Sequence, residues 1–380
     1  MKMLFFTMAL ITVLLHLICP ISAYAEADIS AKSAIVVSGD TGEVIYEKNA
    51  DERMLIASTT KVMTALVAIE NTALGESVKI SPESVAIEGS SMYLKPGESY
   101  TVEELLYGML LVSGNDAAHA LAMHIGGSVE GFAELMNKKA EAIGLQNSAF
   151  ENPHGLDAPG HYSTARDLAA IMREAMKSAF FRRITKARSV TIDGKTYYNH
   201  NRLLKECEGV NGGKTGYTMA SGRSLISSCE RGGTSFIIVT LADPDDWADH
   251  KALYDWAYGA YEYKNVAPAG EYCRLKVISG SCEDVGIAPS RSLSVFLPRG
   301  AEVGIRVELP RFAFAAIRAG EAAGVMIISG DGGELGRVPL CYTQDVPVGQ
   351  GISLTFWERV YRARNIANRY GYYGYGFYPM

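Results

Sequence analysis

Apolar residues recur at helical spacing through much of the chain. Val62, Leu66 and Ile69 would line one side of a helix, and no Gly or Pro interrupts that stretch before Gly75. Residues 105–112 form another apolar run, which a second helical run follows. These patterns predict several long helices, alternating with a few strands such as the β-type run 235–241.

The pattern changes near residues 267–270, a stretch that contains both Pro and Gly. Beyond it, turn pieces such as Asp331–Gly333 separate short runs of apolar and β-branched residues. These runs are residues 272–278, 292–297, 303–309, 325–329 and 338–342. We therefore predict a small all-β domain over residues 267–350, behind a larger domain over residues 26–266.

The N-terminus has the pattern of a targeting segment. A positive start, an apolar run from Met3 to Cys19 and the small-x-small sequence Ala23–Ala25 are typical of a secretory signal peptide. We predict a signal peptide over residues 1–25 and export of the remainder to the cell envelope, at the outer face of the cytoplasmic membrane. An uncleaved anchor is the alternative, because the stretch is slightly longer than usual.

Residues 351–380 form a further segment. One stripe of a helix is apolar and arginines fall to its sides, a pattern typical of a helix lying at a membrane surface. The stripe consists of Phe356, Val360, Ala363, Ala367 and Tyr370. We predict a membrane-surface helix followed by a Tyr/Gly tail; a helix packed on the β domain is the alternative.

Composition narrows the possible partners. The formal net charge of -6 is mild and argues against a nucleic acid. Five cysteines follow residue 25, an odd and sparse set that does not describe a disulfide scaffold. Cys273 and Cys282 flank a turn-like stretch, so either they pair or they stay as buried free thiols.

Ser58 and Lys61 are the first candidates for chemistry. At positions i and i+3 of a helix the two side chains share one face, so the amine can reach the hydroxyl. A serine hydroxyl needs an adjacent base, and a lysine serves as one only if its pKa falls through burial and the helix dipole. An N-cap serine with a solvated lysine is the alternative, but a first-turn lysine opposes the dipole.

Ser113, Gly114 and Asn115 lie in a tight connection between two predicted helices. A hydroxyl and an amide there can relay a proton to a leaving amine and hold a substrate carbonyl. Taken alone, the triplet is better explained as an ordinary turn with Asn or Asp as a capping residue.

Lys214, Thr215 and Gly216 lie in a Gly-rich segment that precedes further β-type sequence. Glycines suit a strand whose backbone a ligand approaches closely. Lys214 and Thr215 supply a charge and a hydroxyl for a carboxylate. A Gly-rich hairpin corner is the alternative.

The three motifs occur in the order that is the signature of active-site serine enzymes acting on penicillins or on the peptides that penicillins imitate. The chain resembles the serine-type D-alanyl-D-alanine carboxypeptidases, which are low-molecular-mass penicillin-binding proteins. It is most similar to the subgroup associated with spore cortex formation. Further family-like stretches are 33–37, 42–46, 152–157, 161–164, 201–204 and 245–247, so the likeness covers about residues 28–350.

The resemblance implies an α/β fold, in which an antiparallel sheet is flanked by helices and a small all-β domain follows. A largely helical subdomain is expected between about Ser81 and Lys186, with the helix of the nucleophile packed under the sheet. The implied reaction is removal of the terminal D-alanine from peptidoglycan peptide stems, and β-lactam antibiotics would bind the same site. Neither a metal nor a cofactor is expected.

The resemblance also implies a role for each motif residue. Ser58 would be the acylated nucleophile and Lys61 its general base. Ser113 and Asn115 would serve proton transfer and substrate positioning. The peptide end would lie along a strand edge formed by Lys214, Thr215 and Gly216. The backbone N–H groups of Ser58 and Tyr217 would form the oxyanion hole.

One feature departs from the family pattern. Many relatives carry an arginine after the strand that follows the Lys-Thr-Gly hairpin, where it helps to hold the terminal carboxylate. Residues 241–250 contain no arginine here. Arg223 is the candidate substitute and a solvated strand-end residue is the alternative, since alternation along the strand leaves its direction open.

Other enzyme classes fit less well. The chain has no Gly-x-Ser-x-Gly for a Ser-His-Asp hydrolase and no His-Glu-x-x-His for a zinc peptidase. A serine β-lactamase shares the triplets, but the Glu-x-x-Leu-Asn loop of the class most like this chain in size is missing. A non-catalytic peptidoglycan-binding scaffold on the same fold would not require an intact Ser58 and Lys61.

Overall fold

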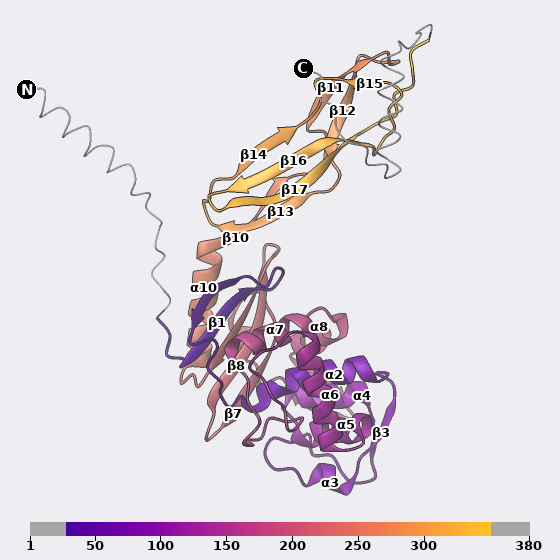
Figure 1. Cartoon of the computed structure of the whole chain (residues 1–380). Helices are drawn as coiled ribbons and strands as arrows, with labels where there is room; N and C mark the ends of the chain where they lie inside the picture. The colour runs from indigo at the N-terminus through magenta and orange to yellow at the C-terminus, as the bar shows by residue number, and fades with distance from the viewer. Residues whose placement is uncertain (1–27, 351–380) are drawn as a thin grey trace, which may run out of the picture. The chain divides into compact units, whose positions relative to one another are not determined.

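Figure 1 shows the computed structural model of the protein, which describes residues 28–350. The predicted signal peptide (1–25) and the predicted C-terminal helix and tail (351–380) lie outside the described residues. The chain divides into two compact units after Ala260, and the three sequence motifs belong to the first unit. No helix within residues 28–350 is long and apolar enough to cross a membrane.

A five-stranded sheet in the order β2-β1-β9-β8-β7 forms the centre of the first unit, and all neighbouring strands are antiparallel. The strands are β1 (Ser33–Ser38), β2 (Val44–Lys48), β7 (Val210–Thr218), β8 (Gly222–Arg231) and β9 (Thr234–Leu241). Helix α10 (Asp246–Ala260) contacts β8 and β9 from one side, while α7 (Ala165–Ala175) contacts β1 and β9 from the other (Figure 1). Because both faces are covered, β1 and β9 are almost entirely buried and rich in Val and Ile. The predicted antiparallel sheet flanked by helices is confirmed.

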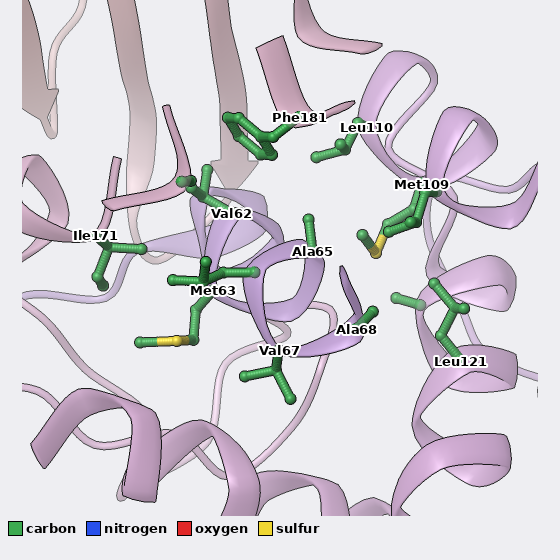
Figure 2. Close-up of a cluster of buried hydrophobic side chains, with 14 of the residues drawn as sticks. Val62, Met63, Ala65, Val67, Ala68, Met109, Leu110, Leu121, Ile171 and Phe181 are labelled. Atoms are coloured by element: carbon green, nitrogen blue, oxygen red, sulfur yellow. The ribbon is translucent and has the colours of Figure 1, made fainter. Parts of the chain in front are cut away.

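The helical subdomain is arranged around α2 (Lys61–Asn71), whose first eight residues are all buried. Three neighbours contact it besides α7: α4 (Val102–Leu111), α5 (Asn115–Gly126) and α6 (Val129–Ala142). In Figure 2 the apolar side chains of α2 face Met109 and Leu121 on one side and Ile171 on another. The apolar stripe predicted from the sequence is therefore only part of a helix that is buried nearly all round.

Local sequence signals explain where these helices begin and end. Thr101 and Glu104 form a capping box at the start of α4. The hydroxyls of three N-cap residues accept a backbone N–H at the starts of α6, α7 and α8 (Ala179–Lys186): Ser128, Thr164 and Ser178. Helix α5 ends at Gly127, whose φ of 73° lies in the left-handed region.

Short elements complete the first unit. They are the helices α3 (Pro82–Val85) and α9 (Leu203–Glu206), the hairpin of β3 (Ser77–Lys79) with β4 (Ser99–Thr101), and the hairpin of β5 (Ser189–Ile192) with β6 (Lys195–Tyr198). Most helices of the unit fall between the predicted limits of the helical subdomain, Ser81 and Lys186.

The nucleophile's helix differs from the prediction in where it begins. Ser58 lies in a 3-10 turn, η1 (Ala57–Thr60), and α2 begins only at Lys61. The turn contacts β7 and β8, and Val62 of α2 belongs to the same buried cluster as Ile226 and Val239 of the sheet. The physical reason is the backbone of Ala57, whose φ of 47° turns the chain sharply before the helix can start.

The second unit is all-β. A six-stranded sheet has the order β14-β16-β17-β12-β11-β15, and β10 pairs with β13 in a separate ribbon. The strands are β10 (Tyr261–Ala267), β11 (Cys273–Ile278), β12 (Asp284–Pro289), β13 (Leu293–Pro298), β14 (Gly304–Glu308), β15 (Ala313–Phe314), β16 (Ala322–Gly330) and β17 (Gly333–Tyr342).

The unit begins at Tyr261, earlier than the predicted boundary at residue 267, because β10 pairs with β13 along its length. The five predicted segments overlap β11, β13, β14, β16 and β17. Strand β12 went unpredicted because its sequence, DVGIAP, contains Gly and Pro. All five cysteines of residues 28–350 are free thiols, so Cys273 and Cys282 are not paired.

Candidate active site

The η1 turn holds Ser58 against the edge strand β7. A Cβ atom added at Gly216 would come within 3.1 Å of the Ile56 carbonyl oxygen and 3.2 Å of the Ser58 backbone nitrogen. A side chain here would push against the η1 backbone, so glycine suits the close passage of the strand past Ser58. A second close contact comes from Gly155, where a Cβ would lie 1.9 Å from the Ala57 carbonyl oxygen.

Lys61 is fully buried, and three oxygen atoms surround its amine. Nζ lies 2.8 Å from Ser58 Oγ, 2.6 Å from Asn115 Oδ1 and 2.7 Å from the carbonyl oxygen of His154. Burial, and next the charge of Lys214, lower the pKa of Lys61 well below its usual value, while Asp116 acts in the opposite direction. When the amine is neutral, the amide and carbonyl oxygens can take its two N–H donors, which leaves the lone pair for the Ser58 hydroxyl.

The carbonyl oxygen of His154 belongs to the site through its contact with Lys61, although none of the three sequence motifs contains it. Its loop is held internally, because Asn152 Oδ1 accepts the Gly155 N–H at 2.7 Å and Asn152 Nδ2 donates to the Leu156 carbonyl at 2.9 Å. The available signal was the family-like stretch 152–157, but a backbone carbonyl leaves no signature of its own in a sequence.

Asn115 is the first residue of α5, and both ends of its side-chain amide are engaged. Oδ1 accepts from Lys61, while Nδ2 donates to the Glu88 carbonyl at 2.6 Å. The next residue, Asp116, accepts the backbone N–H groups of Met92 and Leu94. These bonds fix the orientation of the amide and tie the loop before residue 95 to the start of α5.

Ser113 and Lys214 form a second polar pair. Lys214 is 1% exposed, and its Nζ donates to Ser113 Oγ at 3.1 Å and to the Thr215 carbonyl at 2.7 Å. Burial lowers the pKa of Lys214 to about 7. Ser113 has a φ of 63°, so the tight connection between α4 and α5 turns its hydroxyl toward this amine.

A pocket of about 290 Å³ opens beside these groups. Its lining consists of Ser58, Ser90, Ser113, His200, Thr215, Gly216, Tyr217, Arg223, Asp246 and Trp247. Six of the nine predicted site residues line it, while Lys61, Asn115 and Lys214 are buried behind Ser58 and Ser113. Ser90, His200, Asp246 and Trp247 were not predicted, and only the 245–247 stretch had carried a signal for any of them.

Arg223 faces this pocket. It stands opposite Tyr217 in the β7–β8 pair, and its guanidinium donates to Asp246 Oδ1 at 2.8 Å. The same guanidinium lies over the ring of Trp247, 5.7 Å from its centroid. The Arg223 side chain is 42% exposed whereas that of Asp246 is 3% exposed. A buried carboxylate thus orients a cation that still reaches solvent at the pocket.

The histidines near the site are neutral structural groups. Burial lowers the pKa of His154 to about 3 and that of His161 to about 4. His161 Nδ1 accepts the Glu151 N–H, and Nε2 lies 2.8 Å from Thr60 Oγ1, so both ring nitrogens are occupied. Within residues 28–350 no three His, Cys, Asp or Glu side chains gather as a metal site would require.

Comparisons with known proteins agree with this geometry. A family model described as D-alanyl-D-alanine carboxypeptidase matches residues 21–245. D-alanyl-D-alanine carboxypeptidase DacF of Bacillus subtilis is 34% identical over 83% of this chain and 86% of its own length. D-alanyl-D-alanine carboxypeptidase DacC of Escherichia coli is 31% identical over 91% of this chain and 92% of its own length.

Solved structures give the same result. The structure of penicillin binding protein 5 from Haemophilus influenzae superimposes with a TM-score of 0.67 at 28% identity, covering 86% of this chain and 100% of that chain. A D-alanyl-D-alanine carboxypeptidase from Mycobacterium tuberculosis has a TM-score of 0.60 at 35% identity, covering 63% of this chain and 95% of that chain.

The two buried lysines generate a pH prediction. In Lys214→Gln the positive charge that lowers the pKa of Lys61 is gone, so that pKa should rise. If acylation of Ser58 requires neutral Lys61, the acid limb of its pH–rate profile should move to higher pH. Stopped-flow acylation by a fluorescent penicillin measures this limb. The matched control is Lys205→Gln at an exposed lysine of α9; a Lys214→Gln limb that stays in place would contradict the coupling.

Proposed function

The chain belongs to the D-alanyl-D-alanine carboxypeptidase family, and from this premise we propose that Ser58 is its nucleophile and Lys61 the base that activates it. It is a serine-type hydrolase that removes the terminal D-alanine from D-Ala-D-Ala ends. The observation that carries the residue assignment is the buried Lys61 amine, 2.8 Å from Ser58 Oγ and with a pKa far below normal. A neutral amine at that distance meets the geometric and protonation requirements of a general base.

Acylation proceeds by transfer of the Ser58 proton to Lys61 as Oγ attacks the carbonyl carbon of the penultimate D-alanine. The oxygen of that carbonyl becomes an oxyanion, and we assign its stabilisation to the backbone N–H groups of Ser58 and Tyr217. The support for this hole is the close approach of β7 to η1 at Gly216, where an added Cβ would lie 3.2 Å from the Ser58 nitrogen. Collapse of the intermediate breaks the C–N bond and releases D-alanine.

The departing amine needs a proton, and Ser113 is the group we assign to deliver it. Its hydroxyl lines the pocket and accepts from the buried amine of Lys214, which has a pKa of about 7. Lys214 can therefore resupply a proton near neutral pH. Water then attacks the acyl-Ser58 ester and gives up a proton, which passes through Ser113 to the neutral amine of Lys214. Protonated Lys61 returns its proton to the Ser58 oxygen as the ester bond breaks and the carboxyl product leaves.

Arg223 is the cation we assign to the terminal carboxylate, together with the Thr215 hydroxyl. Lys214 donates to Ser113 and Thr215 from behind the pocket, so its charge reaches the substrate indirectly. Arg223 lines the pocket and keeps two-fifths of its side chain exposed. Asp246 and Trp247 hold the guanidinium, which reduces the entropy lost when it binds an anion.

A β-lactam acylates Ser58 through the same steps, because its strained amide imitates the D-Ala-D-Ala end. Rapid turnover of that ester would require a dedicated base. Asp246 is the one carboxylate among the pocket residues of the described part of the chain, and Arg223 engages it. This arrangement supports a long-lived penicilloyl enzyme over a β-lactamase.

The location of the enzyme follows from its sequence and its substrate class. The pattern of residues 1–25 supports a signal peptide and export to the outer face of the cytoplasmic membrane. The apolar stripe and arginines of residues 351–380 support contact with the membrane surface. Peptidoglycan stem peptides are the substrates available there. The likeness to the spore-cortex subgroup supports a role in sporulation.

Replacing Ser58 by Ala removes the nucleophile and one of the three oxygen atoms around the Lys61 amine, while Asn115 Oδ1 and the His154 carbonyl can still accept from that amine. D-alanine release from a D-Ala-D-Ala peptide should fall by about 10⁴-fold or more. Labelling by a fluorescent penicillin should disappear while the melting temperature stays close to that of the parent. Retained D-alanine release in the purified variant would refute the assignment of Ser58.

The variant Lys61→Arg keeps a positive charge at this position but removes the group that can accept a proton. Guanidinium keeps its proton at any working pH, so the variant should acylate far more slowly than the parent at every pH tested. Penicillin acylation, followed by gel fluorescence over time, measures the rate. Acylation at the parental rate would mean that another group accepts the Ser58 proton.

Arg223→Gln tests recognition of the carboxylate. Loss of a charged hydrogen bond should lower kcat/KM for a D-Ala-D-Ala peptide by about 10- to 100-fold, and leave a substrate that lacks the terminal carboxylate nearly unaffected. Arg202→Gln is the matched control, because Arg202 lies over the same Trp247 ring at 5.7 Å without lining the pocket. Equal losses on both substrates would assign Arg223 a structural role only.

A further inference from the structure

Two cysteines meet where β7 begins. Cys229 on β8 is buried and stands opposite Val210, the first residue of β7. Cys207 directly follows α9, and its sulfur is reached by Arg231, which lies two residues after Cys229 on β8. Both sulfur atoms approach one carbonyl oxygen, that of Glu208, at 3.3 Å from Cys229 and 4.0 Å from Cys207.

Backbone hydrogen bonds before and after Cys207 fix its position next to β8. Cys207 N–H donates to the Leu203 carbonyl at 2.9 Å, and Val210 N–H donates to the Cys207 carbonyl at 3.4 Å. Gly209 has a φ of 85°, and a Cβ there would lie 3.0 Å from Cys229 Sγ. The segment that follows Cys207 is therefore held against the Cys229 side chain, on the side where both sulfur atoms approach the Glu208 carbonyl.

The two thiols have opposite electrostatic surroundings. The hydrogen bond from Cys229 and the Arg231 guanidinium, whose Nη2 lies 3.2 Å from Sγ, lower the pKa of Cys207 to about 7. The same hydrogen bond and burial raise the pKa of Cys229. Arg231 is itself held by the Glu208 carbonyl at 2.8 Å and stacks on Tyr258 at 4.6 Å. One sulfur is thus a ready nucleophile and the other a protected thiol beside it.

Cys207 is also accessible. It is partly exposed and lines a surface pocket of about 640 Å³, together with Lys186, Arg188 and Lys205. The same lining carries three acidic side chains, Glu206, Glu208 and Glu230, so its formal charges cancel, and the cation that favours the thiolate is Arg231 beside the sulfur. This pocket is distinct from the one that contains Ser58.

We propose that Cys207 and Cys229 are a redox site, which forms a reversible disulfide by exchange with an external disulfide. The Cys207 thiolate attacks one sulfur of that disulfide and releases the other as a thiolate. Cys229 then loses its proton and attacks the Cys207 sulfur, which releases the second thiolate. The two protein thiols are oxidised by two electrons, and the external disulfide is reduced to two thiols.

The bond would restrain the strand that carries the Lys-Thr-Gly motif. It would link the end of α9 to β8 at the position where β7 starts, and β7 continues to Lys214 and Tyr217. A cross-link between residues 207 and 229 restricts the unfolded chain, so the oxidised protein should melt at a temperature higher by about 5 °C.

The test uses the purified full chain, incubated with oxidised glutathione and then alkylated and mapped by mass spectrometry. We expect a peptide cross-linked through Cys207 and Cys229, reversed by dithiothreitol, while Cys273, Cys282 and Cys341 remain alkylated as internal controls. Cys229→Ser should stop at a stable glutathione adduct on Cys207, and Cys207→Ser should leave Cys229 unreacted.

Three results would overturn the proposal, and all are read on the unmutated chain. They are a glutathione adduct at Cys207 that persists without the internal bond, a cross-link that joins other cysteines instead, and no reaction at Cys207. The melting temperature, measured before and after oxidation, gives a second readout. A shift that also appears in the Cys207→Ser/Cys229→Ser double variant would assign the stabilisation to another site.

Discussion

The site depends on keeping the amine of Lys61 buried beside the Ser58 hydroxyl. Charged amines are costly to bury, and a second buried amine, Lys214, raises that cost further. The protein meets the cost with oxygen atoms: an amide and a carbonyl for Lys61, a hydroxyl and a carbonyl for Lys214. These bonds do not cancel the cost of burial, which still lowers the pKa values of Lys61 and Lys214. A lysine with a lowered pKa can accept a proton near neutral pH.

The helical core makes this arrangement rigid. Helix α2 is buried from Lys61 to Ala68, so Lys61 cannot swing out to solvent without disturbing close-packed neighbours. Its partners come from separate elements: Asn115 from the start of α5 and the His154 carbonyl from the loop before α7. Each partner is fixed by bonds of its own, which is the preorganisation that electrostatic catalysis requires.

In the function that we propose, the carboxylate end of the pocket differs from the one expected of many relatives. The start of α10 supplies an acid and an aromatic ring, Asp246 and Trp247, and the proposed cation is Arg223 on the neighbouring strand β8. Charge at that end is therefore shared between two elements packed against each other. A cation oriented by a hydrogen-bond acceptor and an aromatic face recurs at Arg231 beside Cys207, where the acceptor is the carbonyl oxygen of the exposed residue Glu208.

Local patterns in the sequence predicted most of the secondary structure and the motifs that contain the candidate site residues. The spacing of Ser58 and Lys61, the apolar run of β9 and the turn-separated strands of the second unit all follow from short-range periodicity. Contacts across the chain needed the tertiary structure, because periodicity says nothing about which distant segments meet. Lys61 reaches partners 54 and 93 residues away, and Lys214 reaches Ser113 across 101 residues. The direction of Arg223, the use of a backbone carbonyl at His154 and the meeting of Cys207 with Cys229 were decided in the same way, by packing rather than by composition.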